Sequence, residues 1–185
     1  MSTSPAAAPA TELIARAVIV DNEHVLLARQ HDKKWFFLPG GHVEPGEGTE
    51  NALLREINEE LGTTARITGF AGAVEHAYTE DNINHRELNL VFTIELADTE
   101  TATSHEDHLE FVLVPFAELA STDLRPSALK DALLVWTSDR TPFWRGCPVS
   151  AAEPANTPRA ADGSRTAARP RSSTERGPNV ASQRE

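Results

Sequence analysis

Residues 41–63, GHVEPGEGTENALLREINEELGT, constrain this chain more than any other segment, because they join a glycine turn to a helix with clustered carboxylates. On a helix that turns 100° per residue, Glu56, Glu59 and Glu60 share an arc of about 100°. Carboxylates three and four residues apart destabilise a helix, and the macrodipole disfavours negative charge near its C-terminal end. Hard divalent cations such as Mg²⁺ favour carboxylate oxygens and are often shared with substrate phosphates. The segment therefore predicts a helix that binds a cation.

Seven positions of this segment follow a fixed spacing. They are Gly41, Glu47, Arg55, Glu56, Glu59, Glu60 and Gly62. At average residue frequencies, seven such identities arise by chance in roughly one chain per million, which argues against a merely solvated acidic face. The pattern resembles the signature box of the Nudix hydrolases. One position departs, because Thr63 stands where the family has an aliphatic residue, but a β-branched threonine begins a strand nearly as well.

The resemblance implies a divalent metal, Mg²⁺ or Mn²⁺, and hydrolysis of a nucleoside diphosphate linked to another group. Transferred position by position, the metal ligands are the carboxylates of Glu59 and Glu60 and the backbone carbonyl of Gly40. Glu56 is implied as a further ligand or as the general base, oriented by Arg55. The catalytic positions are thus Glu56, Arg55 and Glu59, although the box alone does not decide which carboxylate takes the proton.

The remaining box positions have structural roles in this interpretation, namely Gly41, Glu47 and Gly62. Arg55 can reach back from the helix toward Glu47, and such a pair fixes the preceding loop to the helix. We expect Thr49 to cap the helix at its N-terminus and Gly62 to end it.

Candidate substrate contacts lie outside the box, at Arg16, Arg29, Trp35, Glu87, Glu106 and Glu110. A tryptophan can stack on a nucleobase, and arginines on the first two strands can meet phosphate. Members of the family often draw the base or another ligand from a separate loop, and residues 105–110 form an acidic, histidine-containing loop of this kind. Ordinary packing and solvated surface remain the alternatives for all six.

The substrate is less constrained than the reaction. No proline occurs between Pro45 and Pro115, which disfavours the ADP-ribose branch of the family. By elimination, we expect a nucleoside triphosphate or a modified one, as in MutT-like members. Two alternatives stay open: a catalytically weak module that senses nucleotides, and an ADP-ribose or nucleotide-sugar pyrophosphatase. Prenyl diphosphate isomerisation is disfavoured, because the single cysteine, Cys147, lies at the edge of the tail.

Composition divides the chain into three parts. Residues 1–11 and 146–185 are poor in large apolar residues and are expected to be disordered, whereas residues 12–145 form one Nudix domain. The tail from Cys147 holds six arginines and four acids, which leaves a net charge of about −13 before it. Such a body repels nucleic acid, and no apolar run reaches membrane-spanning length. We expect a cytoplasmic monomer or homodimer that acts on a small nucleotide.

Short apolar runs predict the strands, at residues 13–20, 24–29, 35–38, 65–76, 86–96 and 109–114. The first two are expected to form a hairpin. Residues 86–96 alternate, so one face is expected in the core and the other to be mostly polar. Helical segments are predicted at residues 50–61, 116–120 and 127–136. This order indicates an α/β protein, and the resemblance implies a Nudix-type α/β/α sandwich with a mixed central sheet.

Overall fold

The computed structural model describes residues 11–80, 83–97 and 104–147. The segments expected to be disordered, 1–11 and 146–185, lie almost entirely outside these ranges. Where the ranges overlap, Thr11 is the first residue of strand β1, and the backbone N–H of Cys147 donates to Glu75 at 3.0 Å. None of the helices in the described ranges is long and apolar enough to span a bilayer.

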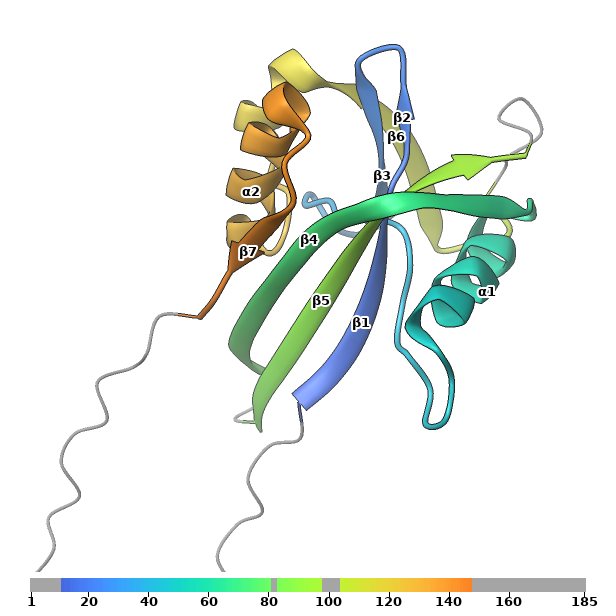
Figure 1. The fold of residues 1–185 in the computed structure, drawn as a ribbon, viewed down its shortest axis with the longest axis vertical. Coiled ribbons are helices and arrows are strands. Elements are labelled where there is room, and N and C mark those ends of the chain that lie inside the picture. The colour runs from blue at the N-terminus through green and yellow to red at the C-terminus, as the bar shows by residue number, and fades with distance from the viewer. Residues whose placement is uncertain (1–10, 81–82, 98–103, 148–185) are drawn as a thin grey trace, which may run out of the picture. The chain divides into compact units, whose positions relative to one another are not determined.

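The strands form two sheets (Figure 1). The larger has the order β1 (Thr11–Val18), β5 (Ile83–Leu96), β4 (Ala65–Glu80), β7 (Phe143–Arg145). It is mixed, because β1 runs parallel to β5, β4 is antiparallel to β5, and β7 is parallel to β4. The smaller sheet is antiparallel and comprises β2 (Val20–Asp21), β3 (His24–Gln30) and β6 (Leu109–Pro115).

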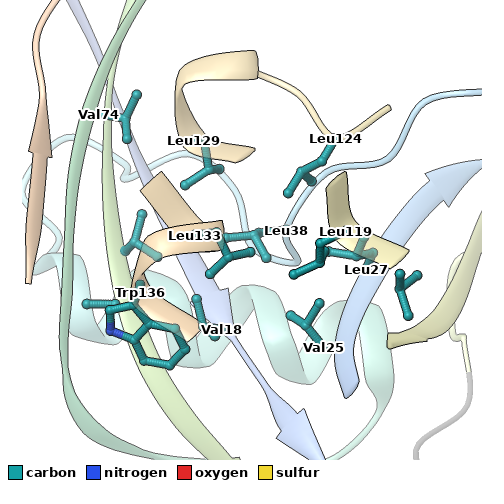
Figure 2. Packing of buried hydrophobic residues seen from close by; sticks show 13 residues of the cluster. Val18, Val25, Leu27, Leu38, Val74, Leu119, Leu124, Leu129, Leu133 and Trp136 are labelled. Atoms are coloured by element: carbon teal, nitrogen blue, oxygen red, sulfur yellow. The ribbon is translucent and has the colours of Figure 1, made fainter. Parts of the chain in front are cut away.

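Two α-helices cover opposite faces of the larger sheet (Figure 1): α1 (Thr49–Leu61) and α2 (Ser127–Asp139), the latter preceded by the 3-10 helix η1 (Phe116–Ser121). On the α1 side, Leu53, Ile57 and Leu61 pack against small and aromatic residues of β1 and β5. On the α2 side, Leu133 and Trp136 pack near Val18 (Figure 2). The expected α/β sandwich with a mixed sheet is confirmed.

The middle of strand β5 is buried on both faces, although the face that carries Glu87, Asn89, Thr93 and Glu95 was expected to be mostly polar. Asn89 and Val91 belong to the face expected to be polar, yet only 1% and 0% of their surfaces are exposed. The reason is that α2 and the smaller sheet cover this side, while α1 covers Phe92 and Ile94 on the other.

The predicted hairpin of residues 13–20 and 24–29 is wrong for its first strand. The two residues of β2 pair with β3 across a turn in which Asn22 and Glu23 have φ of 44° and 63°, as a tight hairpin turn requires. The Leu26 N–H also donates to the Ile19 carbonyl at 3.0 Å. β1 instead pairs in parallel with β5, and the paired residues are 75 positions apart in the chain, as for Thr11 and Arg86. Sequence spacing favours local pairing and gave no sign of this one.

Two smaller expectations also change. Residues 35–38 form no regular strand but make single bridges, Ala28 with Phe37 and Phe36 with Leu124. Helix α1 is preceded by Gly48 at the N-cap position, so Thr49 is its first residue and not its cap. Gly62 ends the helix as expected, at φ 65°.

Candidate active site

The loop before α1 lies directly on β1. The backbone N–H of Ala15 donates to the Gly41 carbonyl, and that of Ala17 donates to the Pro39 carbonyl, both at 2.9 Å. Gly40 lies between these bonds at φ +114°, and a Cβ there would stand 2.3 Å from the carbonyl oxygen of Ala15. Only glycine allows this conformation and this approach. The loop backbone is thereby fixed beneath the acidic helix.

Glu60 is the buried carboxylate of the site, with 4% of its surface exposed. Its Oε2 accepts the backbone N–H of Gly40 at 3.0 Å. Burial raises the pKa of Glu60 to about 7, while the Gly40 hydrogen bond and the charge of Arg16 act in the opposite direction. A carboxylate this buried is costly to ionise unless a cation compensates it. Glu60 is therefore suited to hold a metal ion.

Arg55 gathers three of the box carboxylates. Its Nε and Nη2 donate to both oxygens of Glu47, at 3.1 and 3.0 Å. Its Nη1 donates to Glu56 at 2.7 Å and to Glu59 at 3.3 Å, and Nη2 also reaches the His42 carbonyl at 3.2 Å. The pKa of Glu47 is lowered mainly by its hydrogen bond to Arg55. Arg55 thus ties the loop to the helix and orients Glu56.

The donor set fits a hard divalent cation. It consists only of oxygens, from Glu56, Glu59, Glu60 and the Gly40 carbonyl, which is the ligand type that Mg²⁺ and Mn²⁺ favour. In the part of the chain that the structure describes, no three His, Cys, Asp or Glu side chains already converge as metal ligands. The three glutamates have separate partners instead: Arg55 donates to Glu56 and Glu59, whereas Glu60 accepts the Gly40 N–H.

A pocket of about 640 Å³ adjoins this loop. Aromatic and cationic side chains line much of it, including Arg16, Trp35, Phe37, Tyr78, Arg125 and Lys130. Its size and mixed lining are typical of sites for small molecules. Arg16 of β1 also donates to the Gly40 carbonyl at 2.7 Å, so it connects the pocket to the loop of residues 38–41.

Two loops form one wall of the pocket and are joined through their backbones. The N–H of Phe36 donates to the Asp123 carbonyl, and the N–H of Arg125 donates to the Phe36 carbonyl, both at 2.8 Å. Side chains of the two loops are also in contact: the guanidinium carbon of Arg125 lies 5.2 Å from the Trp35 ring centroid. Such a cation–π contact holds both side chains against the same wall.

The structure separates the six candidates outside the box. Three of them line the pocket: Arg16, Trp35 and Glu87. Arg29 and Glu110 do not line it. They pair with each other across β3 and β6, with Arg29 Nε 3.2 Å from Glu110 Oε2. Glu106 also lies outside the pocket; its charge helps to raise the pKa of Glu60, and it contacts His108. It therefore stays a candidate for the metal side of the site.

Several pocket residues were missed by sequence reasoning: His76, Tyr78, Asp123, Arg125 and Lys130. Tyr78 stacks between His76 and His85, at centroid distances of 5.1 and 4.8 Å. The residues near Pro126 had a weak signal in the sequence, because polar residues flank this proline where a helix is predicted to begin.

A family comparison settles the class of this fold. The model of the NUDIX domain matches residues 11–160. This chain belongs to the NUDIX family. Residues 41–63, whose spacing resembles the Nudix box, lie within the matched range and form the loop and helix described above.

Curated relatives of this Nudix protein match it over short segments. A putative 8-oxo-dGTP diphosphatase of Bacillus subtilis is 36% identical over 64 residues, which are 35% of this chain and 43% of the relative. An ADP-ribose pyrophosphatase of Methanocaldococcus jannaschii is 43% identical over 54 residues, 28% of this chain and 32% of the relative. The chain thus spans less than half the length of these relatives.

Solved structures agree with the Nudix fold. The ORF135 protein of E. coli superposes with a TM-score of 0.58 at 23% identity, over 71% of this chain and 94% of that protein. A MutT protein of Methanosarcina mazei gives 0.56 at 23% identity, over 72% and 97%. At such identities the likeness concerns the fold alone.

Proposed function

We propose that this Nudix protein hydrolyses the diphosphate linkage of a nucleoside diphosphate derivative with the help of Mg²⁺ or Mn²⁺. The observation that carries the proposal is the buried Glu60 carboxylate, bonded to Gly40 beside two further glutamates and a substrate-sized pocket. Gly40, Glu59 and Glu60 would hold the cation, which would neutralise the charge that develops on the phosphates. Family membership supports the reaction class.

The chain's own groups carry the proton. Glu56 is the base in this proposal: it accepts a proton from the water that attacks phosphorus as the bridging P–O bond breaks. Arg55 donates to Glu56 at 2.7 Å and holds its carboxylate in one orientation. Glu106 is the second candidate for the base. Its charge raises the pKa of Glu60, which indicates that it lies near the proposed metal ligands.

We propose a nucleoside triphosphate, or a modified one, as substrate. The pocket offers an aromatic wall at Trp35 and charged groups of both signs, which suits a nucleobase with several hydrogen-bonding edges. The Bacillus relative described as an 8-oxo-dGTP diphosphatase supports this class. The Methanocaldococcus relative supports an ADP-ribose substrate instead, so both belong in the first assay.

The proposal is tested with a panel of nucleoside triphosphates, 8-oxo-dGTP, nucleotide sugars, ADP-ribose and dinucleoside polyphosphates. We expect a nucleoside monophosphate to appear only with Mg²⁺ or Mn²⁺, as measured by chromatography, and its release to be lost in Glu59→Gln. Tight nucleotide binding in calorimetry without any product would favour a sensor, and turnover that persists in Glu59→Gln would contradict the assigned site.

Trp35→Ala is expected to raise KM for the preferred nucleotide by about 10-fold with little change in kcat, since base–aromatic stacking contributes about 1–3 kcal/mol. Steady-state kinetics with the substrate identified above measures both constants. Trp144→Ala is the matched control, because Trp144 is 58% exposed and does not line the pocket. Equal effects of the two substitutions would remove Trp35 from the substrate site.

A further inference from the structure

Strand β1 accounts for every carbonyl of the loop formed by residues 38–41. Its backbone N–H groups bond alternate carbonyls, those of Pro39 and Gly41. The other two are bonded by one side-chain atom, since Nη1 of Arg16 donates to the Leu38 carbonyl at 3.1 Å and to the Gly40 carbonyl at 2.7 Å. Both backbone groups of Gly40 are therefore hydrogen-bonded: its N–H donates to Glu60, and its C=O accepts from Arg16.

The Arg16 side chain is itself held in place from two directions. Its Nε donates to Oδ1 of Asn89 at 3.4 Å, and its guanidinium carbon lies 5.6 Å from the Phe37 ring centroid. Asn89 is 1% exposed and donates in turn to Glu87 at 3.2 Å. This arrangement gives a role to Asn89, a buried polar side chain of β5.

We propose that Arg16 is a positioning residue that aims the Gly40 carbonyl at the cation held by Glu59 and Glu60. The inference rests on the proposed function, in which the Gly40 carbonyl is a ligand. A carbonyl oxygen has two lone pairs, so it can accept Arg16 and ligate a metal at once. Groups that orient a metal ligand from behind typically contribute 10- to 100-fold to metal affinity.

The direction in which metal affinity changes when Arg16 is removed distinguishes the positioning role from a purely electrostatic effect. Arg16 is a cation near an acidic site, so by Coulomb's law its removal alone strengthens the binding of a second cation. A guanidinium that merely competed with the metal for the Gly40 oxygen would act in the same direction. Only positioning makes metal binding weaker when Arg16 is lost.

The test is Mn²⁺ binding without nucleotide, followed by electron paramagnetic resonance on the full chain. We expect Arg16→Met to weaken Mn²⁺ binding about 10- to 100-fold and Arg16→Lys to recover part of the loss, because the ammonium still donates to carbonyls. Asn89→Leu, which leaves Arg16 but removes its Nε partner, is expected to weaken binding less. Arg66→Met is the control, since Arg66 pairs with Glu95 on the exposed sheet surface.

The outcomes are distinct. Unchanged or tighter Mn²⁺ binding in Arg16→Met overturns the positioning role while leaving the proposed function intact, provided that Glu60→Gln loses Mn²⁺. Wild-type protein that binds no Mn²⁺, or a Glu60→Gln variant that binds it normally, overturns both. If circular dichroism shows Arg16→Met to be unfolded, Arg16→Lys and Asn89→Leu decide: wild-type affinity in both overturns the role, and weakened affinity in both supports it.

Discussion

Glu60→Gln is expected to lower metal-dependent turnover by about 10³-fold or more. The substitution removes the charge of the most buried carboxylate of the site, and metal ions contribute several kcal/mol to such reactions, at about 1.4 kcal/mol per factor of ten. Turnover with saturating Mg²⁺ on the substrate found in the panel measures the loss. A variant that retains a tenth of the wild-type kcat would show that Glu60 does not hold the catalytic metal.

The same substitution is expected to stabilise the protein when the metal is removed with EDTA. Burial raises the pKa of Glu60 from 4.5 to about 7 in the folded state, so the folded protein binds the proton more tightly than the unfolded chain. The stability of metal-free wild type therefore falls as pH rises from about 4.5 to about 7, by about 3 kcal/mol. Glutamine imitates the neutral acid and escapes this loss.

Urea unfolding at pH 5 and pH 8 measures this difference. At pH 8 in EDTA, Glu60→Gln should unfold at higher urea than wild type, and at pH 5 the two should be similar. Glu59→Gln is the control without this effect, because the Glu59 side chain is 55% exposed. Equal stability of wild type and Glu60→Gln at pH 8 would mean that another group already compensates the Glu60 charge.

Gly40→Ala is the second substitution with a large expected effect, a loss of about 3 kcal/mol or more in the free energy of unfolding. The new Cβ would stand 2.3 Å from the Ala15 carbonyl oxygen and 3.0 Å from Leu53 Cδ1, at φ +114°. Strained backbone of this kind costs about 1–3 kcal/mol before any clash is counted. Because the clash is with backbone, β1 and the loop must separate.

Gly46→Ala is the matched control for this prediction. Gly46 also has a positive φ, +86°, but an added Cβ would meet no atom within 4 Å. We expect it to cost only about 1 kcal/mol, the conformational contribution alone. Urea unfolding of both variants gives the comparison, and similar losses at the two glycines would show that the loop can leave β1 without penalty.

The acidic helix could be predicted because its information is local. Helical geometry alone places Glu56, Glu59 and Glu60 on one edge, and Gly62 marks the end of α1 as its left-handed φ requires. The start of the helix was less certain, since glycine and threonine are both acceptable N-caps, and the structure selects Gly48.

The pocket could not be predicted, because its walls depend on contacts between distant segments. Phe36 meets Leu124 across 88 positions of sequence through a bridge that no local pattern encodes. The parallel pairing of β1 with β5 is equally non-local, and without it Arg16 has no visible relation to Asn89. The sequence indicated that Arg16 could reach phosphate, but not that it bonds the loop carbonyls.

The backbone bridge between Phe36 and the 123–125 segment also bears on how substrate preference can change within this fold. Main-chain atoms hold this wall together, and the side chains of Trp35 and Arg125 form part of its surface. Substitutions at those two positions can therefore alter which base is accepted without moving the wall. The box carboxylates come from α1 and not from these two segments, so new specificities can arise while the hydrolytic chemistry is retained.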